Sequence, residues 1–231
     1  MFKSYSKFFA NNLGSRSFSQ SSQSVRIGVV SGCHSSGSAE SSPMAHKAVP
    51  VQGSFDRIEQ SGVFDVEWAP AAETSVEIHA QEHVLPMMDV YVRNGTLVVA
   101  SKPGSFSCTE RIVVRVQSPS LTHVEAAGSG DIWVSDVPGP ALTVELSGSG
   151  AVRASGHVER LSVSLAGSGE FDGSQLRATH AELSVAGSGD IRAVVAQDVV
   201  AKVTGSGDIA IRGAAGNRNT RIMGSGDIRF Y

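Results

Sequence analysis

Apolar and polar residues alternate along most of the chain after residue 50. The pattern is clearest in residues 142–147, which read LTVELS, in residues 161–166, which read LSVSLA, and in residues 181–186, which read AELSVA. A period of two residues predicts β-strands with one buried and one exposed face. No segment has the period of an amphipathic helix, so the pattern predicts an all-β protein. The same alternation occurs earlier, in residues 63–68, 75–79, 88–92, 97–100 and 112–116.

A short glycine motif follows each of the later strands. It reads Gly-Ser-Gly, then a small or acidic residue, then an apolar one, as in Gly128-Ser129-Gly130-Asp131-Ile132. The first glycines of successive copies are 20, 19, 20, 18 and 19 residues apart. A period of this length predicts a repeat architecture with 19–20 residues in each turn. The glycines of the six copies are Gly128, Gly130, Gly148, Gly150, Gly167, Gly169, Gly187, Gly189, Gly205, Gly207, Gly224 and Gly226.

Two ways of stacking these repeats fit the pattern. The glycine motifs could be the hairpin turns of an antiparallel meander. They could also be the corners of a parallel β-helix, in which each repeat forms one coil. We favour the β-helix, because only the stacking of each corner on the equivalent corner of the next coil explains why all of them share one motif. Each coil would then have a strand, a glycine corner, a second strand, a looser corner and a short third segment near residues such as Val137 and Val158.

Each residue of the corner has an expected structural role. Glycine suits a bend that needs a positive φ or a close approach of neighbouring coils. The next position is Asp in four of the six copies, and its carboxylate can accept hydrogen bonds from corner amides. These carboxylates would form an acidic column along one edge, and stacked carboxylates repel unless a cation lies between them. Capping is the favoured role, and Asp190, Asp208 and Asp227 are weak candidates for a cation site.

Residues 1–48 differ from the rest of the chain. They are rich in Ser, Asn and Gly, and the first acidic residue is Glu40. Three interpretations stay open: a bacterial lipoprotein signal with lipidation at Cys33, an organellar transit peptide around Arg16-Ser17-Phe18-Ser19, and an unpacked tail. We therefore predict a leader or linker over residues 1–48 and a single β-helix domain over residues 49–231.

Composition and motifs exclude several functional classes. The formal net charge is −3, whereas a nucleic-acid-binding protein would carry a basic stripe. No run of about 18 apolar residues is present, so the sequence predicts no transmembrane helix. The seven histidines lack metal-ligand spacing, and neither a hydrolase elbow nor a phosphate-binding loop occurs. We predict no catalytic residues, no cofactor, and no metal site beyond the weak aspartate candidates.

The corner motif, together with Phe55-Asp56-Arg57-Ile58, Asn94-Gly95-Thr96-Leu97 and Ser118-Pro119-Ser120-Leu121, resembles a known bacterial family. This is the family described as "putative auto-transporter adhesin, head GIN domain", and the resemblance covers about residues 50 to 231. It implies a right-handed parallel β-helix of the pectin-lyase type and an extracytoplasmic location, in the periplasm, on the outer membrane surface or secreted. It also implies an adhesion or surface-structural role without catalytic residues. An organellar or cytoplasmic location stays open, because the N-terminal signal is weak.

The sequence thus predicts a non-enzymatic, extracytoplasmic β-helix domain that acts in adhesion or surface structure. Two alternatives stay open: a carbohydrate-binding or carbohydrate-active protein, and a sensory or regulatory module of the envelope. Trp133 should face outward and Trp68 lies at a strand end, so that both rings could stack on sugars. The expected partner is a protein or a glycan, and the open coil at the C-terminal end of the repeats could also bind a second copy.

Overall fold

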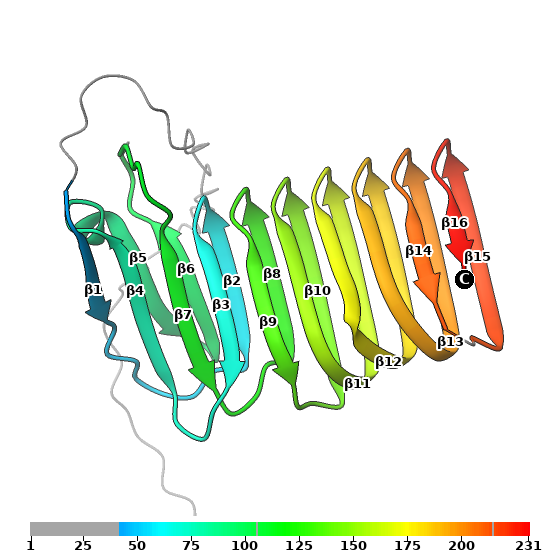
Figure 1. The fold of residues 1–231 in the computed structure, drawn as a ribbon, viewed down its shortest axis with the longest axis horizontal. Helices are drawn as coiled ribbons and strands as arrows, with labels where there is room; N and C mark the ends of the chain where they lie inside the picture. Colours follow the sequence, from blue (N-terminus) through cyan, green and yellow to red (C-terminus); the bar gives the residue numbers. More distant parts are fainter. Residues whose placement is uncertain (1–41, 105, 214) are drawn as a thin grey trace, which may run out of the picture.

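The computed structural model describes residues 42–104, 106–213 and 215–231. These residues form a β-helix whose coils stack side by side along the long axis of the molecule (Figure 1). The predicted all-β solenoid is thereby confirmed. The helical element of the described residues is the 3-10 helix η1 (Leu85–Met87), and no helix in this part of the chain could span a bilayer. The strands are β1 (Met44–Ala48), β2 (Arg57–Gly62), β3 (Asp65–Pro70), β4 (Ser75–Gln81), β5 (Met88–Arg93), β6 (Thr96–Ser101), β7 (Val113–Ser118), β8 (His123–Gly128), β9 (Ile132–Val137), β10 (Ala141–Gly148), β11 (Ala151–Gly167), β12 (Glu170–Gly187), β13 (Asp190–Gly205), β14 (Ile209–Arg212), β15 (Asn217–Gly224) and β16 (Ile228–Phe230).

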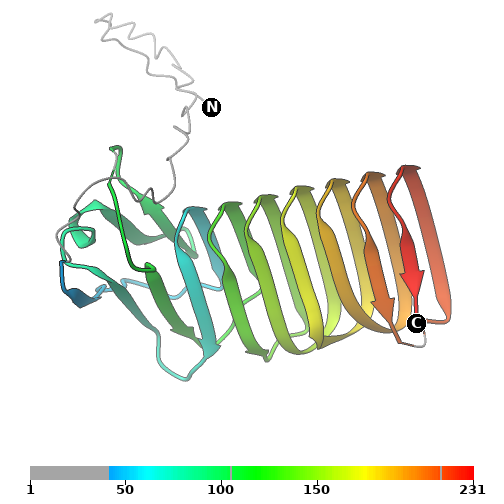
Figure 2. The ribbon, with the colours of Figure 1, turned by 45° about the horizontal axis from the view of Figure 1, so that its top comes forward.

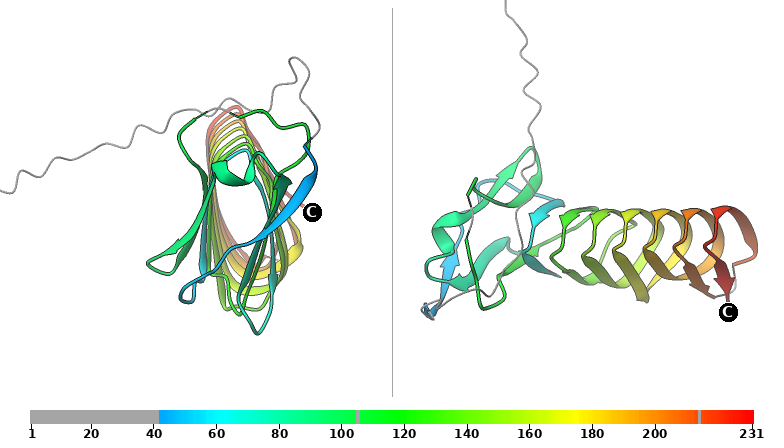
Figure 3. Two further views of the ribbon diagram at one scale, coloured as in Figure 1. Left: turned by 90° about the vertical axis from the view of Figure 1, so that its left-hand side faces the viewer. Right: turned by 90° about the horizontal axis from the view of Figure 1, so that it is seen from above.

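Each coil has two long sides, which appear as the walls of a flattened tube in a view along the coil axis (Figure 3). The first face consists of the strands that lead up to the glycine corners. It runs from β6 through β2, β8 and β10 to the C-terminal halves of β11, β12 and β13, and then to β15. The second face consists of the strands that leave the corners. It runs from β7 through β3 and β9 to the N-terminal halves of β11, β12 and β13, and then to β14 and β16.

The inward side chains of both faces form one continuous core. The pairing is parallel and in register, so that like positions stack in columns. One such column contains Val144, Val163, Leu183 and Ala201, each at most 1% exposed. Burial of these apolar side chains is the main force that holds one coil on the next.

The second bend of each coil lies opposite the glycine corners. In β11, β12 and β13 the strand pairing continues through this bend, so each strand runs from one glycine corner to the next. The predicted third segment is therefore not a separate strand, and its apolar residues Val158, Leu176 and Val195 are buried at the bend. Register shifts occur between Gly173 and Arg177 and between Ala178 and His180, and they adjust the length of the coil on this side.

The front end of the β-helix departs from the repeat (Figure 2). Strand β2 stacks directly on β8, and β3 on β9, because the chain after β3 leaves the coil and forms the front of the molecule. Within this part β4 pairs antiparallel with β1 and β7, and β5 pairs antiparallel with β6. Parallel stacking thus continues to β6 on one face and β7 on the other, and the antiparallel pairs add β1, β4 and β5 beyond it.

The N-terminal boundary of the fold lies before residue 49. Strand β1 falls within the predicted leader of residues 1–48, yet it pairs along its whole length with β4. Cys33 and the segment Arg16-Ser17-Phe18-Ser19, which carried the two targeting predictions, lie outside the described residues.

Candidate ligand-binding groove beside the glycine corners

The glycine corners form one edge of the β-helix, where neighbouring backbones almost touch. Gly187 has a φ of +142°, and a Cβ atom there would lie 2.3 Å from the carbonyl oxygen of Gly167. A Cβ atom on Gly189 would lie 2.2 Å from the carbonyl oxygen of Gly169, although Gly189 has no positive φ. The first glycine of the corner is therefore needed for space, and in five of the six copies also for a positive φ, whereas the second is needed for space alone.

Backbone hydrogen bonds join each corner to the one before it. The serine N–H donates to the carbonyl of the first glycine in the preceding corner, over 2.8–3.0 Å in all six copies. This serine position thus acts through its backbone. The donors are Ser129, Ser149, Ser168, Ser188, Ser206 and Ser225, and the acceptors are Gly62, Gly128, Gly148, Gly167, Gly187 and Gly205.

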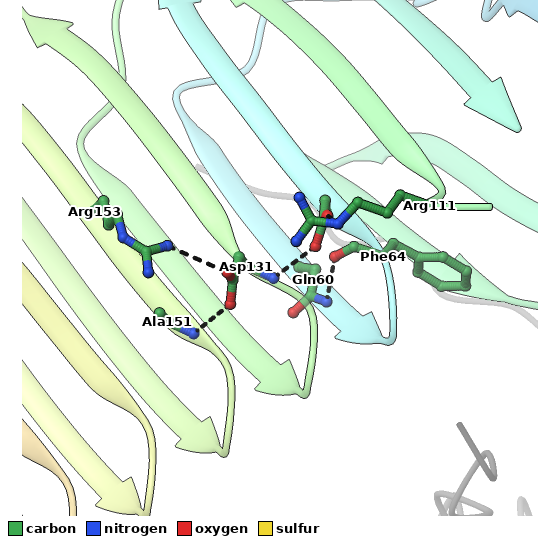
Figure 4. A network of polar contacts seen from close by, with 7 residues as sticks. Gln60, Phe64, Arg111, Asp131, Ala151 and Arg153 are labelled. Carbon is green, nitrogen blue, oxygen red and sulfur yellow. Dashed lines mark hydrogen bonds and ion pairs between the residues drawn. The ribbon is translucent and has the colours of Figure 1, made fainter. Parts of the chain in front are cut away.

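The acceptor Gly62 reveals a seventh corner that the Gly-Ser-Gly motif does not show. Gly62 pairs with Gly128, and Val66 pairs with Ile132. Phe64 stands where the second glycine would be, and its carbonyl accepts a hydrogen bond from Gln60 Nε2 at 3.0 Å (Figure 4). The signal in the sequence is a glycine followed three residues later by an aspartate and a β-branched residue.

The aspartates of the corners hold successive coils together. In each case one carboxylate oxygen accepts the N–H of the equivalent residue in the next corner. Figure 4 shows this bond between Asp131 and Ala151. The pairs are Asp65 with Asp131 (3.0 Å), Asp131 with Ala151 (2.9 Å), Asp190 with Asp208 (3.0 Å) and Asp208 with Asp227 (2.9 Å).

The corners without aspartate show why that residue recurs. After Ala151, the N–H of Glu170 donates instead to the carbonyl of Gly150 at 3.2 Å. After Glu170, the N–H of Asp190 donates to the carbonyl of Gly169, also at 3.2 Å. Alanine has no acceptor, and the carboxylate of Glu170 pairs with Arg192. An aspartate is thus the residue that bonds to the coil above.

Arginines of the second face accompany the acidic column. Arg153 lies 3.2 Å from Asp131 (Figure 4), and Arg111 lies 3.3 Å from Asp65. Arg229 lies 2.8 Å from Asp227 and 3.9 Å from Asp208. These guanidinium groups offset the repulsion around Asp65, Asp131, Asp208 and Asp227.

The contacts between Asp227 and Arg229 shift the pKa of both groups. The hydrogen bond from Arg229 and the N–H of Ile228 lower the pKa of Asp227, and the same hydrogen bond to Asp227 raises the pKa of Arg229. Among the described residues, no group of three or more side chains has the arrangement of a metal site. The cation site at Asp190, Asp208 and Asp227 therefore stays a prediction.

One outward row of the second face combines charge with a large aromatic ring. The row crosses the strands at the level of Trp133, two positions after the acidic column. Its charged members alternate in sign across most of its length, which favours pairing between neighbouring strands. The row reads Glu77, Arg115, Glu67, Trp133, Arg153, Asp172 and Arg192.

Two adjoining hollows open beside this row, and Trp133 and Ser135 line both of them. The larger has a volume of about 460 Å³ and the smaller about 270 Å³. Together they form one groove across β4, β7, β3, β9, β11 and β12. The larger hollow is lined by Glu67, Ser75, Glu77, Arg115, Gln117 and Trp133, and the smaller by Trp133, Ser135, Arg153, Asp172, Ser174 and Gln175.

The two tryptophans have different places in the structure. Trp133 is half-buried, and the guanidinium carbons of Arg111 and Arg153 lie 5.8 and 5.6 Å from its ring centroid. Trp68 is 1% exposed, and its indole N–H donates to Ser118 Oγ at 2.8 Å. The prediction that both rings could stack on sugars is therefore wrong for Trp68, which faces into the core.

A third hollow, of about 380 Å³, lies on the first face near the bend opposite the glycine corners. Its polar wall contains His180, whose Nδ1 is 2.6 Å from Asp198. The hydrogen bond from Asn217, with a smaller contribution from His180, lowers the pKa of Asp198. Leu161 and Ala181 are buried in the core beneath it, and Val200, which is 46% exposed, adds to its mostly apolar wall.

Comparison of the sequence with known protein families gives a match that covers most of the described residues. The sequence pattern of the family described as "putative auto-transporter adhesin, head GIN domain" matches residues 54–215, which is more than half of the chain. The chain belongs to this family. Among curated proteins, none matches the chain in sequence.

Solved structures of similar fold include proteins from Bacteroides fragilis and Parabacteroides distasonis. A putative adhesin from Bacteroides fragilis is 19% identical with a TM-score of 0.66, over 82% of this chain and 97% of the other. A putative lipid binding protein from Parabacteroides distasonis is 21% identical with a TM-score of 0.53, over 81% of this chain and 96% of the other. At these identities the likeness shows a common fold.

Proposed function

We propose that the protein is a non-enzymatic, extracytoplasmic adhesin-like module that presents a ligand-binding groove on a rigid β-helix. Membership of an adhesin-head family supports the surface role. The observation that carries the proposal is how the polar groups are distributed. The repeated carboxylates serve inter-coil hydrogen bonds, whereas the polar side chains around Trp133 line open hollows.

The same distribution argues against a carbohydrate-cleaving enzyme at the corners. A glycosidase needs two carboxyl groups that are held in a cleft and free to exchange protons. Asp190 and Asp208 instead each accept a backbone N–H at the glycine edge, away from the hollows. The corner carboxylates are structural in this proposal.

The location can be tested by protease treatment of intact cells of the source organism. A surface protein is degraded before lysis, and we expect rapid loss of the full chain under these conditions. Protection until the outer membrane is opened would contradict a surface role, and protection until the inner membrane is opened as well would contradict an extracytoplasmic one.

The binding role needs a second experiment. Beads coated with the purified full chain should retain cells or envelope fragments, and beads coated with heat-unfolded protein should not. Release of reducing or unsaturated sugar ends from polysaccharides, abolished by Asp190→Ala or Asp208→Ala, would contradict the non-enzymatic proposal.

Self-association through the last coil was also predicted, and the side chains of β15 weigh against it. Arg218 occupies the inward row of Val199, and its guanidinium lies 4.2 Å from the ring centroid of Phe230. An inward charge on an edge strand opposes the addition of another strand. We propose that Arg218 keeps this coil from pairing with a second copy, although Ile222 and Met223 are each 45% exposed.

The mass of the protein in solution tests this point. Light scattering after size exclusion should give a monomer for the wild type and a rising fraction of larger species for Arg218→Val. A wild-type dimer that Met223→Lys dissociates would overturn the proposal and restore self-association.

A further inference from the structure

The groove on both sides of Trp133 has the chemistry of a site for a neutral, hydroxyl-rich chain. Its larger hollow carries Glu67, Glu77 and Arg115, and its smaller hollow carries Arg153 and Asp172. Negative and positive groups are nearly equal in number, so the groove has little net attraction for a charged ligand. Donors and acceptors are both plentiful, which matches a ligand whose hydroxyl groups can both donate and accept.

The charged side chains are already held by neighbours, which fixes their positions in the absence of ligand. Arg115 Nε donates to Glu67 at 3.1 Å, and Ser75 Oγ donates to Gln117 Oε1 at 3.0 Å. Asp172 Oδ1 accepts the N–H of Ser174 at 2.9 Å. Polar groups on rigid strands that are oriented before binding lose little entropy when a ligand arrives.

Trp133 supplies the apolar surface between the hollows. Arg111 and Arg153 lie within cation–π range of its ring and restrain the orientation of the side chain. The ring is half-buried and borders both hollows, so a ligand that passes from one to the other would contact its exposed part. A planar aromatic surface among polar groups suits the apolar C–H face of a sugar ring.

The length of the groove fits an extended chain. It crosses six strands, β4, β7, β3, β9, β11 and β12. Neighbouring strands lie about 4.8 Å apart, so the groove is roughly 24 Å long. It is open, with polar and apolar surface in about equal parts, and would leave much of the apolar surface of an acyl chain in water.

We propose that this groove binds a neutral polysaccharide, with the ring of Trp133 stacked on one sugar unit and the polar row bonded to its hydroxyls. The proposal rests on the adhesin-like function above and names the ligand class for it. Glu67, Arg115, Arg153 and Asp172 are the flanking polar residues. The fold needs Trp133 for no core contact, since Ile132 and Val134 fill the buried positions on either side of it in β9.

Affinity electrophoresis of the full chain tests the proposal, with gels that contain xylan, glucomannan, mixed-linkage β-glucan or dextran. We expect at least one neutral polysaccharide to retard the wild type. Trp133→Ala should raise the apparent Kd about tenfold or more, and Trp133→Phe, which keeps an aromatic ring, by about threefold or less. Glu145→Ala on the first face is the matched control and should bind as the wild type does.

Several results would overturn the proposal. They are a wild type that no neutral gel retards, retardation that survives Trp133→Ala, and stronger retardation by polygalacturonate than by any neutral polymer. Trp68 is the remaining tryptophan of Trp133→Ala, so the blue-shifted emission of a buried indole and an unchanged unfolding midpoint will show that the variant is folded. Surface exposure with cell binding but no sugar binding would remove this inference alone. A protected, intracellular protein would remove the proposed function.

Discussion

The chain turns at both edges of each coil, but the two turns are built differently. At the glycine edge, every corner repeats one backbone path, and Gly148, Gly167, Gly187 and Gly205 stack on one another. At the opposite edge, the corresponding positions vary: Val137 pairs with Gly156, which pairs with Leu176. Register shifts occur on the way to this second bend, while pairing at the glycine edge stays in step.

This difference shows that the sequence motif repeats at the edge where the backbones of neighbouring coils are in close contact. A side chain at the glycine edge would meet a carbonyl oxygen of the coil below, so the residue type is dictated. The opposite edge has Val, Leu or Gly at equivalent positions and loops of different length, although single glycines there are also constrained: a Cβ atom on Gly156, at a φ of +120°, would lie 2.5 Å from Val137 N. The groove at Trp133 lies on a face between these edges, where neither constraint acts on outward side chains.

The largest expected effect comes from adding a methyl group at each edge. Gly187→Ala would place a Cβ atom 2.3 Å from Gly167 O at a φ of +142°, and we expect a loss of more than about 3 kcal/mol in the free energy of unfolding. Gly139→Ala, in the opposite bend between β9 and β10, would meet no atom nearer than 3.7 Å. Its effect should be within about 0.5 kcal/mol or slightly stabilising.

Urea unfolding followed by fluorescence measures both variants. Similar losses of unfolding free energy in the two variants would contradict the contrast between the edges. A larger loss for Gly139→Ala than for Gly187→Ala would contradict it more strongly.

This contrast also explains what the sequence could predict. The glycine edge has a recurring Gly-Ser-Gly motif. The period of the repeats, the alternating strands and the parallel stacking could therefore be predicted from the sequence. The seventh corner at Gly62 was missed, because Phe64 replaces the second glycine and the pattern breaks. The continuous path through the opposite bend was missed because that edge has no common residue.

The groove was predictable only in part. The alternation placed Trp133 outward, and it sets Trp68 in the same row as the buried Phe64 and Val66. The expectation that Trp68 is accessible at a strand end was wrong, because its indole N–H has a buried partner in Ser118. That partner comes from β7, in the front part that the repeat does not describe. The row of Glu67, Arg115 and Trp133 likewise joins residues far apart in the sequence, and only the register of β3, β7 and β9 shows their proximity.

A smaller effect is expected at the aspartate of the glycine edge. Asp208→Ala removes the acceptor for the N–H of Asp227 and should cost about 0.5–1 kcal/mol. Asp208→Asn keeps a side-chain oxygen at the same place and should lose less than half as much. Equal losses in the two variants would mean that charge, through Arg229, matters more than the inter-coil hydrogen bond.

The converse change sharpens the same point. Ala151 interrupts the acidic column, and the N–H of Glu170 bonds instead to Gly150 O at 3.2 Å. Ala151→Asp would offer a carboxylate to that N–H, and we expect a gain of about 0.5 kcal/mol in unfolding free energy. Ala166→Asp, on the outward surface of the first face, is the control for added charge and should give no gain. A loss at Ala151→Asp would show that repulsion from Asp131 and Glu170 outweighs the new hydrogen bond.

The smallest expected effect is a dependence on pH at the last corner. Arg229 and the N–H of Ile228 lower the pKa of Asp227 below its ordinary value of 3.8, so folding favours the ionised form. The stabilisation is therefore complete above about pH 5 and is lost as the pH falls through the lower, folded-state pKa. Asp227→Asn should lower the thermal midpoint slightly at pH 6, and the difference from wild type should vanish near pH 2. Because the pair is exposed, 0.5 M NaCl should reduce the difference at pH 6. In an Arg229→Gln background, Asp227→Asn should have a smaller effect than in the wild type, since the guanidinium is the main cause of the lowered pKa. A difference that persists at pH 2 would mean that Asp227 acts through packing at the glycine edge and not through its charge.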